Sequence, residues 1–474
     1  MAVSNVLSMR STESFEVVDV TSPEQRLKRL FLAIGVVTGF LPYVAIPYGH
    51  SSAFQLSQLS LIAAGLFGAR AAKRRLILLS FLLILPLSVS LALLTFQTNP
   101  VFSTSIGLKY ATNLVLSMTA VLGAAAVTEA EDFLVLLRSL TAALLINSAF
   151  GLVQFLGFRH HSFPFQAMYH MNPTFASWDP TAIQAFLNSG GRPFGAFSEP
   201  SAMAACIGPW LAMAIIIYFI LERLGVRISL LQRTLTFAGI SGGALLVAFS
   251  QSGMSLFALV GLFGCIAVFA MKSPNREADV NPFPRSEGLH LQKFARRLVI
   301  LAIVVAPIGV AQLMNRAAGG TANSSWTLRW NSIQEGFHLW FTSVHTFVVG
   351  TGPGQVPRLF VVSAPGIIKF YGFVKIVTIW SILINYIVEV GVIGLIVWLF
   401  IFVKIAGAVR LSRIPKVASF IVFFLWFVGV VATTSYSTLT PVWLLLGFLF
   451  TWDLLPTAEA VAPPRNGIER PLLR

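Results

Sequence analysis

The chain has 474 residues, of which 56% are hydrophobic and 11% are charged. This composition excludes a soluble globular domain, because apolar runs of about 20 residues recur along the chain and each can cross a bilayer core of roughly 30 Å. The formal net charge of +15 is typical of basic cytoplasmic loops in a membrane protein and does not indicate a nucleic-acid partner. Both cysteines, Cys206 and Cys265, lie inside apolar runs, which indicates small buried side chains.

Polar and apolar segments alternate in a pattern that predicts an all-α, polytopic membrane protein with about twelve transmembrane helices. The first 29 residues contain no apolar segment of the kind found in signal peptides, so no cleavable signal is expected. In chain order, the expected segments are a cytoplasmic tail (1–29), transmembrane helices one to five (30–156), a periplasmic loop (157–200), helices six to nine (201–314) with a cytoplasmic loop (272–297), a large periplasmic loop (315–377), helices ten to twelve (378–455) and a cytoplasmic tail (456–474).

The distribution of basic residues predicts the orientation of these helices. Arg or Lys follows every even-numbered apolar run, most densely in RAAKRR (70–75), although acidic residues precede Arg138 after the fourth run. The short loops on the other side carry none. Because basic loops stay in the cytoplasm, we expect both termini there and both long loops on the outer side of a bacterial inner membrane.

The first long loop leads into the stretch NSGGRPFGAFSEPSAMAA, from Asn188 to Ala205. This stretch places Arg192 and Glu199 just before an apolar run that begins near Ser201. Two interpretations are open. Glu199 can complement the positive end of the helix dipole while Arg192 lies among lipid headgroups. Alternatively, both side chains bind a ligand, and the glycines let the backbone approach it closely.

The second long loop is basic, although it is expected on the outer face. Its single acidic residue, Glu335, is outnumbered by Arg316, Arg329, Arg358, Lys369 and Lys375. Long loops can escape the positive-inside rule, but an anionic ligand would also account for the surplus. Because arginine forms bidentate contacts with phosphate, the arginines favour the anionic ligand.

Within this loop, the segment SSWTLRWNSIQEGFHLWF is predicted to form a helix on the membrane surface. Ser325 can cap it, and apolar residues recur on one side at Trp326, Trp330, Ile333, Phe337 and Trp340. His338 borders this face and is either a bystander or a catalytic base. The following TGPGQ, with Gly352, Gly354 and Gln355, is expected to be a tight turn with exposed backbone, and it lacks the Lys-Ser/Thr ending of a P-loop.

Other polar residues give weaker signals. No cluster of His, Cys, Asp or Glu has the spacing of metal ligands, so neither a metal nor another cofactor is predicted. Glu389 lies inside the tenth apolar run, one turn after Asn385. An intramembrane carboxylate is a candidate functional residue, but a protonated or hydrogen-bonded packing residue is the preferred interpretation.

Three stretches resemble the O-antigen polymerase and O-antigen ligase superfamily of membrane glycosyltransferases, in particular its exopolysaccharide polymerase branch. GGRPFGAFSEPS resembles a loop of pattern R-x-x-G-x-F-x-E-P-S, LRWNSIQEGFHLWFTSVHTFVVGTGPGQ resembles part of a large outer loop, and INYIVEVGVIGLIVWL resembles the next span. Two features depart from the superfamily. Ligases carry a His-Asn pair where this chain has Trp380 and Ser381, and the turn SQSG (250–253) lacks an Arg often found there.

The resemblance implies an inner-membrane polymerase that joins glycan repeat units carried on undecaprenyl pyrophosphate, with no metal or cofactor. Arg192 and Arg329 are then expected to stabilise the leaving diphosphate, Glu199 to be the base for the acceptor hydroxyl, and His338 to be the second choice of base. The residues expected to help bind substrate are Arg316, Arg358, Gly352, Gly354 and Gln355.

The expected partners are lipid-linked oligosaccharides, membrane lipids, a chain-length regulator and a flippase. Two alternatives remain: a ligase that transfers the glycan to another acceptor, and a twelve-helix transporter or lipid-linked glycan flippase. The transporter is disfavoured because the last six spans show no repeat of the first six and intramembrane charges are few.

Overall fold

The computed structural model describes residues 22–47, 53–97, 101–172, 180–188, 191–197, 199–271, 285–318, 321–363, 379–412, 414–432 and 438–455. In this part of the chain, the strands are β1 (Ala45–Pro47) and β2 (Ala53–Gln55), which pair antiparallel. The helices up to residue 223 are α1 (Pro23–Gly39), α2 (Leu56–Leu66), α3 (Arg70–Leu94), α4 (Thr104–Thr119), η1 (Ala120–Ala126), α5 (Ala130–Arg159), η2 (Gln166–His170), α6 (Pro180–Asn188) and α7 (Pro200–Arg223). The later helices are α8 (Leu230–Phe249), α9 (Gly253–Met271), α10 (Arg285–Ala318), α11 (Thr321–Trp340), α12 (Val344–Val349), α13 (Val356–Ser363), α15 (Ile382–Val390), α16 (Val392–Leu411), α17 (Lys416–Ala432), α18 (Thr440–Phe450) and η4 (Trp452–Leu454).

Six helical segments of the described chain are long and apolar enough to cross a membrane. They are Arg70–Leu94, Thr104–Ala126, Ala130–Arg159, Pro200–Glu222, Leu230–Phe249 and Val392–Leu411. Shorter apolar helices are Leu56–Leu66, Gly253–Phe269, Lys416–Val430 and Thr440–Phe450. The structure therefore shows an all-α, multi-pass membrane protein, and twelve spans remain the sequence-based prediction.

Two predicted runs are divided in ways that their composition does not reveal. The first apolar run of the sequence, at residues 30–46, ends in strand β1. Strand β2 occupies the beginning of the second apolar run. The tenth run breaks at Gly391, between α15 and α16, where φ is 77°. A Cβ atom at Gly391 would lie 2.3 Å from the carbonyl oxygen of Val348. Only glycine fits this close approach of two backbones.

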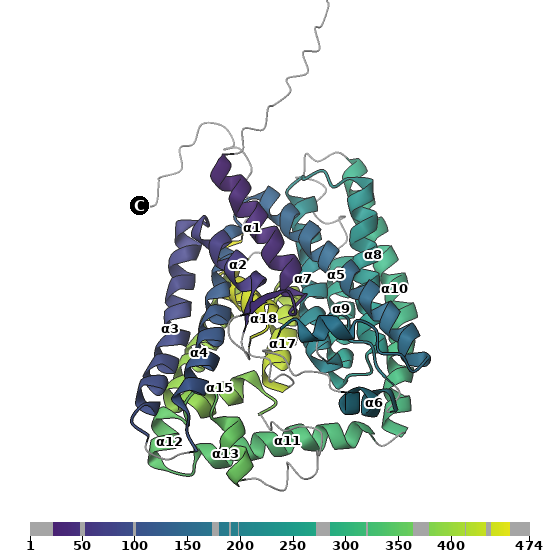
Figure 1. Cartoon of the computed structure of the whole chain (residues 1–474). Coiled ribbons are helices and arrows are strands. Elements are labelled where there is room, and N and C mark those ends of the chain that lie inside the picture. Colours follow the sequence, from purple (N-terminus) through teal and green to yellow (C-terminus); the bar gives the residue numbers. More distant parts are fainter. Residues whose placement is uncertain are drawn as a thin grey trace, which may run out of the picture.

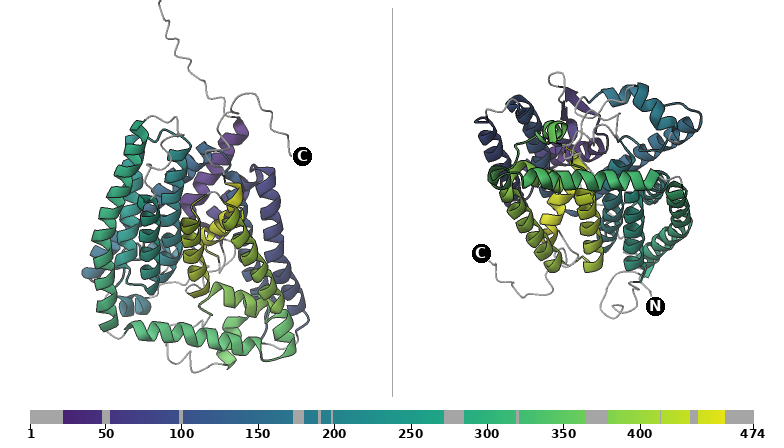
Figure 2. Two further views of the ribbon diagram at one scale, coloured as in Figure 1. Left: turned by 180° about the vertical axis from the view of Figure 1, so that it is seen from behind. Right: turned by 90° about the horizontal axis from the view of Figure 1, so that it is seen from below.

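The long helices stand side by side, and α11 crosses one end of the bundle (Figure 1; Figure 2, right). The predicted helix of the second loop is therefore confirmed, although it begins at Thr321, so that Ser325 lies within it instead of capping it. Helix α7 is the central helix of the bundle, since 94% of its membrane span is buried, against 28% for α16.

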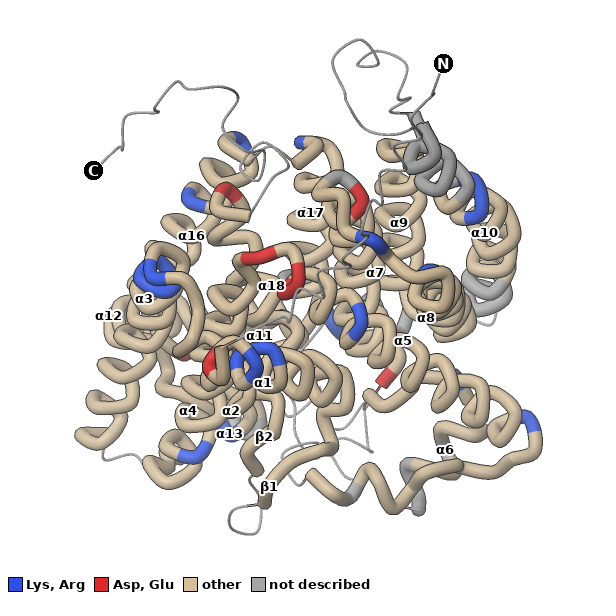
Figure 3. Tube along the Cα trace, turned by 90° about the horizontal axis from the view of Figure 1, so that it is seen from above, with Lys and Arg blue, Asp and Glu red and all other residues tan. Residues whose placement is uncertain are grey.

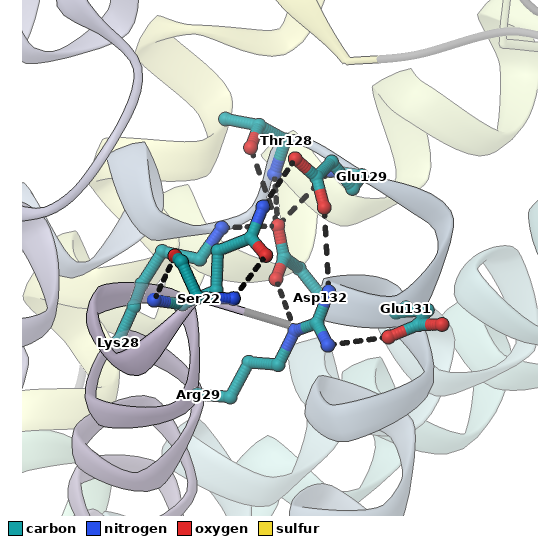
Figure 4. A network of polar contacts seen from close by, with 8 residues as sticks. Ser22, Lys28, Arg29, Thr128, Glu129, Glu131 and Asp132 are labelled. Atoms are coloured by element: carbon teal, nitrogen blue, oxygen red, sulfur yellow. Dashed lines mark hydrogen bonds and ion pairs between the residues drawn. The ribbon is translucent and has the colours of Figure 1, made fainter. Parts of the chain in front are cut away.

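An ion-pair network joins the beginnings of α1 and α5 (Figure 4). The ammonium group of Lys28 lies 2.7 Å from Oδ2 of Asp132, and Nε of Arg29 donates to Oδ1 of the same carboxylate at 3.2 Å. Arg29 also pairs with Glu129 and Glu131. The acidic residues after the fourth run, which interrupt the predicted charge pattern, thus neutralise basic residues of α1.

A second ion pair closes the same end of the molecule. Arg75, near the beginning of α3, lies 2.8 Å from the carboxylate of Asp453 in η4. Figure 3 looks down on this end and shows basic and acidic positions of several helices together. The predicted basic loop at residues 70–75 therefore shares one end of the bundle with the beginning of α1 and the end of α18.

Asp132→Asn should destabilise the protein by about 3–5 kcal/mol, because it leaves the buried ammonium of Lys28 without a counter-charge. Thermal unfolding of the detergent-solubilised protein measures the effect. Glu131→Gln is the matched control: the Glu131 side chain is 54% exposed, and exposed pairs contribute at most about 1 kcal/mol. Equal melting temperatures for the two variants would contradict a structural role for the buried pair.

Candidate functional site

Of the residues between α6 and α7, the structure describes 191–197 and 199, and residues 193–197 are buried in the bundle. The backbone of this segment is held by Gln154 of α5, whose side chain is itself fully buried. Oε1 of Gln154 accepts hydrogen bonds from the amides of Phe194 (2.8 Å) and Gly195 (2.9 Å), and Nε2 donates to the carbonyl of Gly195 (2.7 Å). These bonds satisfy backbone groups that would otherwise be unpaired inside the membrane.

Asn147, seven residues earlier in α5, holds the next part of the segment. Its Oδ1 accepts from the amide of Ala196 at 3.0 Å, and its Nδ2 donates to the carbonyl of Phe40 at 3.1 Å. Gly195 has a φ of 60°, and a Cβ there would lie 2.7 Å from Oδ1 of Asn147. Asn147 and Gln154 are not among the predicted site residues. Their signal in the sequence is two amides seven residues apart, on one helix face, in an apolar run.

The segment ends at Glu199, the N-cap residue of α7. Pro200 occupies the first turn of that helix, as the sequence indicates. The side chain of Glu199, however, makes no capping hydrogen bond. Its carboxylate accepts a hydrogen bond from the hydroxyl of Ser201 instead. The prediction of a helix start is therefore confirmed, but capping does not account for the carboxylate.

The second long loop contributes Arg329, whose charge acts on Glu199. Arg329 lies on α11, and its guanidinium carbon is 5.3 Å from the centre of the Trp380 ring. Nε of Arg329 is buried and has no hydrogen-bond partner in the described structure. Buried polar atoms nearly always have a partner, so this nitrogen marks a place where a ligand or a water molecule fits.

The electrostatics of Glu199 link the two loops. Burial raises the pKa of Glu199 above its ordinary value, while the hydrogen bond from Ser201 and the charges of Arg329 and Arg192 lower it. Burial lowers the pKa of Arg329, and the charge of Glu199 acts against that shift. The structure thus brings Glu199 within the influence of two predicted site arginines. Arg192 also donates to the carbonyl of Gln251, at 3.5 Å, in the turn between α8 and α9.

The predicted glycine turn faces the protein. The amide of Gly354 donates to Oε1 of Glu389 (3.0 Å), and the amide of Gly352 donates to the carbonyl of Glu389 (3.1 Å). Gln355 exchanges hydrogen bonds with the backbone of Ser103 at 2.9 and 3.0 Å. Glu389 is buried and its Oε1 is hydrogen-bonded, in line with the packing interpretation, but its Oε2 has no hydrogen-bond partner in the described structure. The observed contacts of Gly352, Gly354 and Gln355 are structural, and their contact with substrate remains a prediction.

The other predicted site residues lie on α10, α11 and α13. His338 is exposed on α11. Arg358 lies on α13 and is half-buried. The side chain of Arg316, near the end of α10, is outside the described part of the structure. Neither His338 nor Arg358 is among the charges that act on Glu199.

Comparison with known proteins identifies no family for this chain. The chain matches no protein-family model and no curated protein. In the described residues, no group of three or more His, Cys, Asp and Glu side chains could hold a metal ion. The feature that remains is a half-buried carboxylate under the influence of two guanidinium groups, at the beginning of the central helix.

Arg329→Gln should raise the pKa of Glu199 further, because it removes a positive charge that lowers this pKa. Infrared spectra of the protonated carboxyl group, recorded against pH as a difference from Glu199→Gln, measure the shift. Arg358→Gln is the control and should leave the titration of Glu199 unchanged. If the pKa of Glu199 is the same in Arg329→Gln as in the unchanged protein, Arg329 and Glu199 are not coupled.

Proposed function

We propose that the chain is a membrane glycosyltransferase, a polysaccharide polymerase that joins repeat units carried on undecaprenyl pyrophosphate. The observation that carries the proposal is one half-buried carboxylate, Glu199, on which the charges of both Arg329 and Arg192 act. Glycosyl transfer from a diphosphate requires a proton acceptor and a group that stabilises the leaving anion. A carboxylate under the electrostatic influence of two guanidinium groups supplies both.

The arginines suit the diphosphate of such a donor. Nε of Arg329 is buried without a hydrogen-bond partner in the described structure, and an anionic oxygen would satisfy it. Guanidinium groups bind phosphate oxygens through two parallel hydrogen bonds, and burial strengthens the attraction because the effective dielectric constant is low. Trp380 packs against this guanidinium at a position where the resembled ligases carry His, which favours a polymerase over a ligase.

In the proposed step, the oxygen of an acceptor hydroxyl forms a bond to the anomeric carbon of the donor sugar. The bond between that carbon and the diphosphate oxygen breaks, and its electron pair leaves with the diphosphate. Glu199 accepts the hydroxyl proton. Arg192 and Arg329 offset the charge that develops on the leaving group. Because the donor is already activated, the step needs no nucleotide.

The proposal includes a location at the outer face of a bacterial inner membrane, with both termini in the cytoplasm. The ion-paired end that contains Lys28 and Arg75 lies away from α11, and basic residues mark the cytoplasmic side. A flippase would deliver the lipid-linked oligosaccharides to the outer face, and a chain-length regulator would act on the product.

Purified protein that receives lipid-linked repeat units and a chelator, with no nucleotide sugar, should lengthen the glycan. Arg192→Lys and Arg329→Lys should each lower the rate about 100-fold, because a lysine cannot reproduce a bidentate contact with the diphosphate. Glu199→Gln should lower it by about 100-fold or more, because the base is lost. Gel separation of product lengths measures the rate.

Arg410→Lys is the matched control, since Arg410 is exposed near the end of α16, and it should polymerise normally. Full-length polymer from both Arg192→Lys and Arg329→Lys would show that these arginines are membrane anchors only. Transport of lipid-linked glycans across vesicles without any joining would identify the protein as a transporter and end the polymerase proposal.

Reporter fusions test the proposed orientation. Fusions after Arg75 and near Glu287 should report the cytoplasm, and fusions after Pro180 and after residue 365 should report the periplasm, because Arg and Lys are retained on the cytoplasmic side. Paired alkaline phosphatase and fluorescent-protein fusions provide the measurement. A cytoplasmic signal from either long loop would contradict both the orientation and the outer-face reaction.

A further inference from the structure

A cavity of about 250 Å³ opens between the end of α7 and the beginning of α8, lined by Glu222, Gly225, Val226, Arg227, Ile228 and Arg233. It lies far from the candidate site, because Glu199 is at the other end of α7. That helix has 24 residues, which corresponds to a length of about 36 Å. None of the predicted site residues lines the cavity.

Two buried polar atoms at this place have no hydrogen-bond partner in the described structure: Oε1 of Glu222 and Nε of Arg233. Glu222 and Arg233 form an ion pair at 3.4 Å. This distance is longer than that of a charge-assisted hydrogen bond, about 2.7–2.9 Å, so both groups can still form shorter hydrogen bonds with a ligand. The Glu222 side chain is only 9% exposed, and Tyr218, one turn earlier on α7 and beside Glu222, is fully buried. Since buried polar atoms usually have partners, this group indicates a bound polar molecule.

The charges at the cavity favour an anion. Two guanidinium groups, Arg227 and Arg233, line it against the single carboxylate of Glu222. Arg227 is exposed and forms no hydrogen bond or ion pair through its side chain with the described residues. The beginning of α8 adds the positive end of a helix dipole. Glu222, in turn, requires a hydrogen-bond donor, such as a hydroxyl group, on the same ligand.

We propose that this cavity binds a phosphate ester that carries a free hydroxyl group, as in the headgroup of phosphatidylglycerol. Phosphate oxygens accept from Arg227 and Arg233, and the hydroxyl donates to Glu222. Leu230 and Leu231, at the beginning of α8, are 78% and 69% exposed and offer an apolar surface to acyl chains. Basic pockets between membrane helices recognise anionic headgroups in this way. A soluble glycerol phosphate has the same polar groups without the chains.

Full-length protein in a nonionic detergent can be titrated with short-chain phosphatidylglycerol, with phosphatidylcholine of equal chain length, and with glycerol 3-phosphate. Native mass spectrometry measures the affinities. Phosphatidylglycerol should bind more tightly than phosphatidylcholine. Arg227→Gln should weaken that binding about tenfold, the loss expected for one charge-assisted hydrogen bond. Arg410→Gln, the same change on an exposed residue of α16, should leave it unaltered.

Arg227→Gln is the main variant because it removes no hydrogen bond or ion pair within the described protein. Arg233→Gln leaves Glu222 unpaired, so its melting temperature must be measured beside its affinity. Glycerol 3-phosphate that binds as tightly as the lipid, and that Arg227→Gln weakens, would support the site and identify a soluble source. Two results would overturn the proposal and leave water as the occupant of the cavity. One is equal affinity for the two lipids without binding of glycerol 3-phosphate. The other is a loss of phosphatidylglycerol affinity in Arg410→Gln that equals the loss in Arg227→Gln.

Discussion

The structure depends on one constraint: polar groups inside a membrane must find their partners within the protein. Helix α5 meets this constraint for the segment before α7. The amides of Asn147 and Gln154 accept from three consecutive backbone N–H groups, at residues 194–196. Without these two side chains, an irregular segment could not pass through the interior of the bundle. With them, it carries Arg192 and Glu199 to the beginning of α7, the most buried of the six long apolar spans.

The same constraint means that the charged groups of the candidate site reduce the stability of the folded protein. Burying charges away from water is unfavourable unless they are paired and hydrogen-bonded. Burial shifts the pKa of Glu199 upward and that of Arg329 downward, so each shift opposes the charged form. Nε of Arg329 remains unpartnered in the described structure. Stability alone would favour apolar residues here, and perturbed groups of this kind gather at functional sites.

The sequence predicted the class of the fold, since apolar runs and basic loops follow from hydropathy and charge. It also placed Glu199 at the beginning of a helix and Arg329 on a helix of the second loop. Hydropathy could not reveal the break at Gly391, because φ and close backbone contact are set by tertiary packing. The convergence of the two loops was expected only from the proposed chemistry, since their separation in sequence carries no distance information.

The prediction for the glycine turn was wrong for a physical reason. The turn at residues 351–355 was expected to expose its backbone, because glycine-rich turns often do so at binding sites. In the structure, Glu389 accepts from this turn, so two features that the sequence presented as separate candidates satisfy each other. Composition gives the donors and acceptors of a membrane protein, but their pairing depends on which helices are neighbours.

Arginines of the bundle have two different roles, and the difference follows from the available partners. At one end, Arg29 and Arg75 are paired with carboxylates in the described structure, so their charges are neutralised and join helices. Arg329, at the other end, has an aromatic ring beside it and an unpartnered nitrogen. Charge counts in loops therefore predict orientation, whereas a ligand site is found only where the structure leaves a buried guanidinium incompletely satisfied.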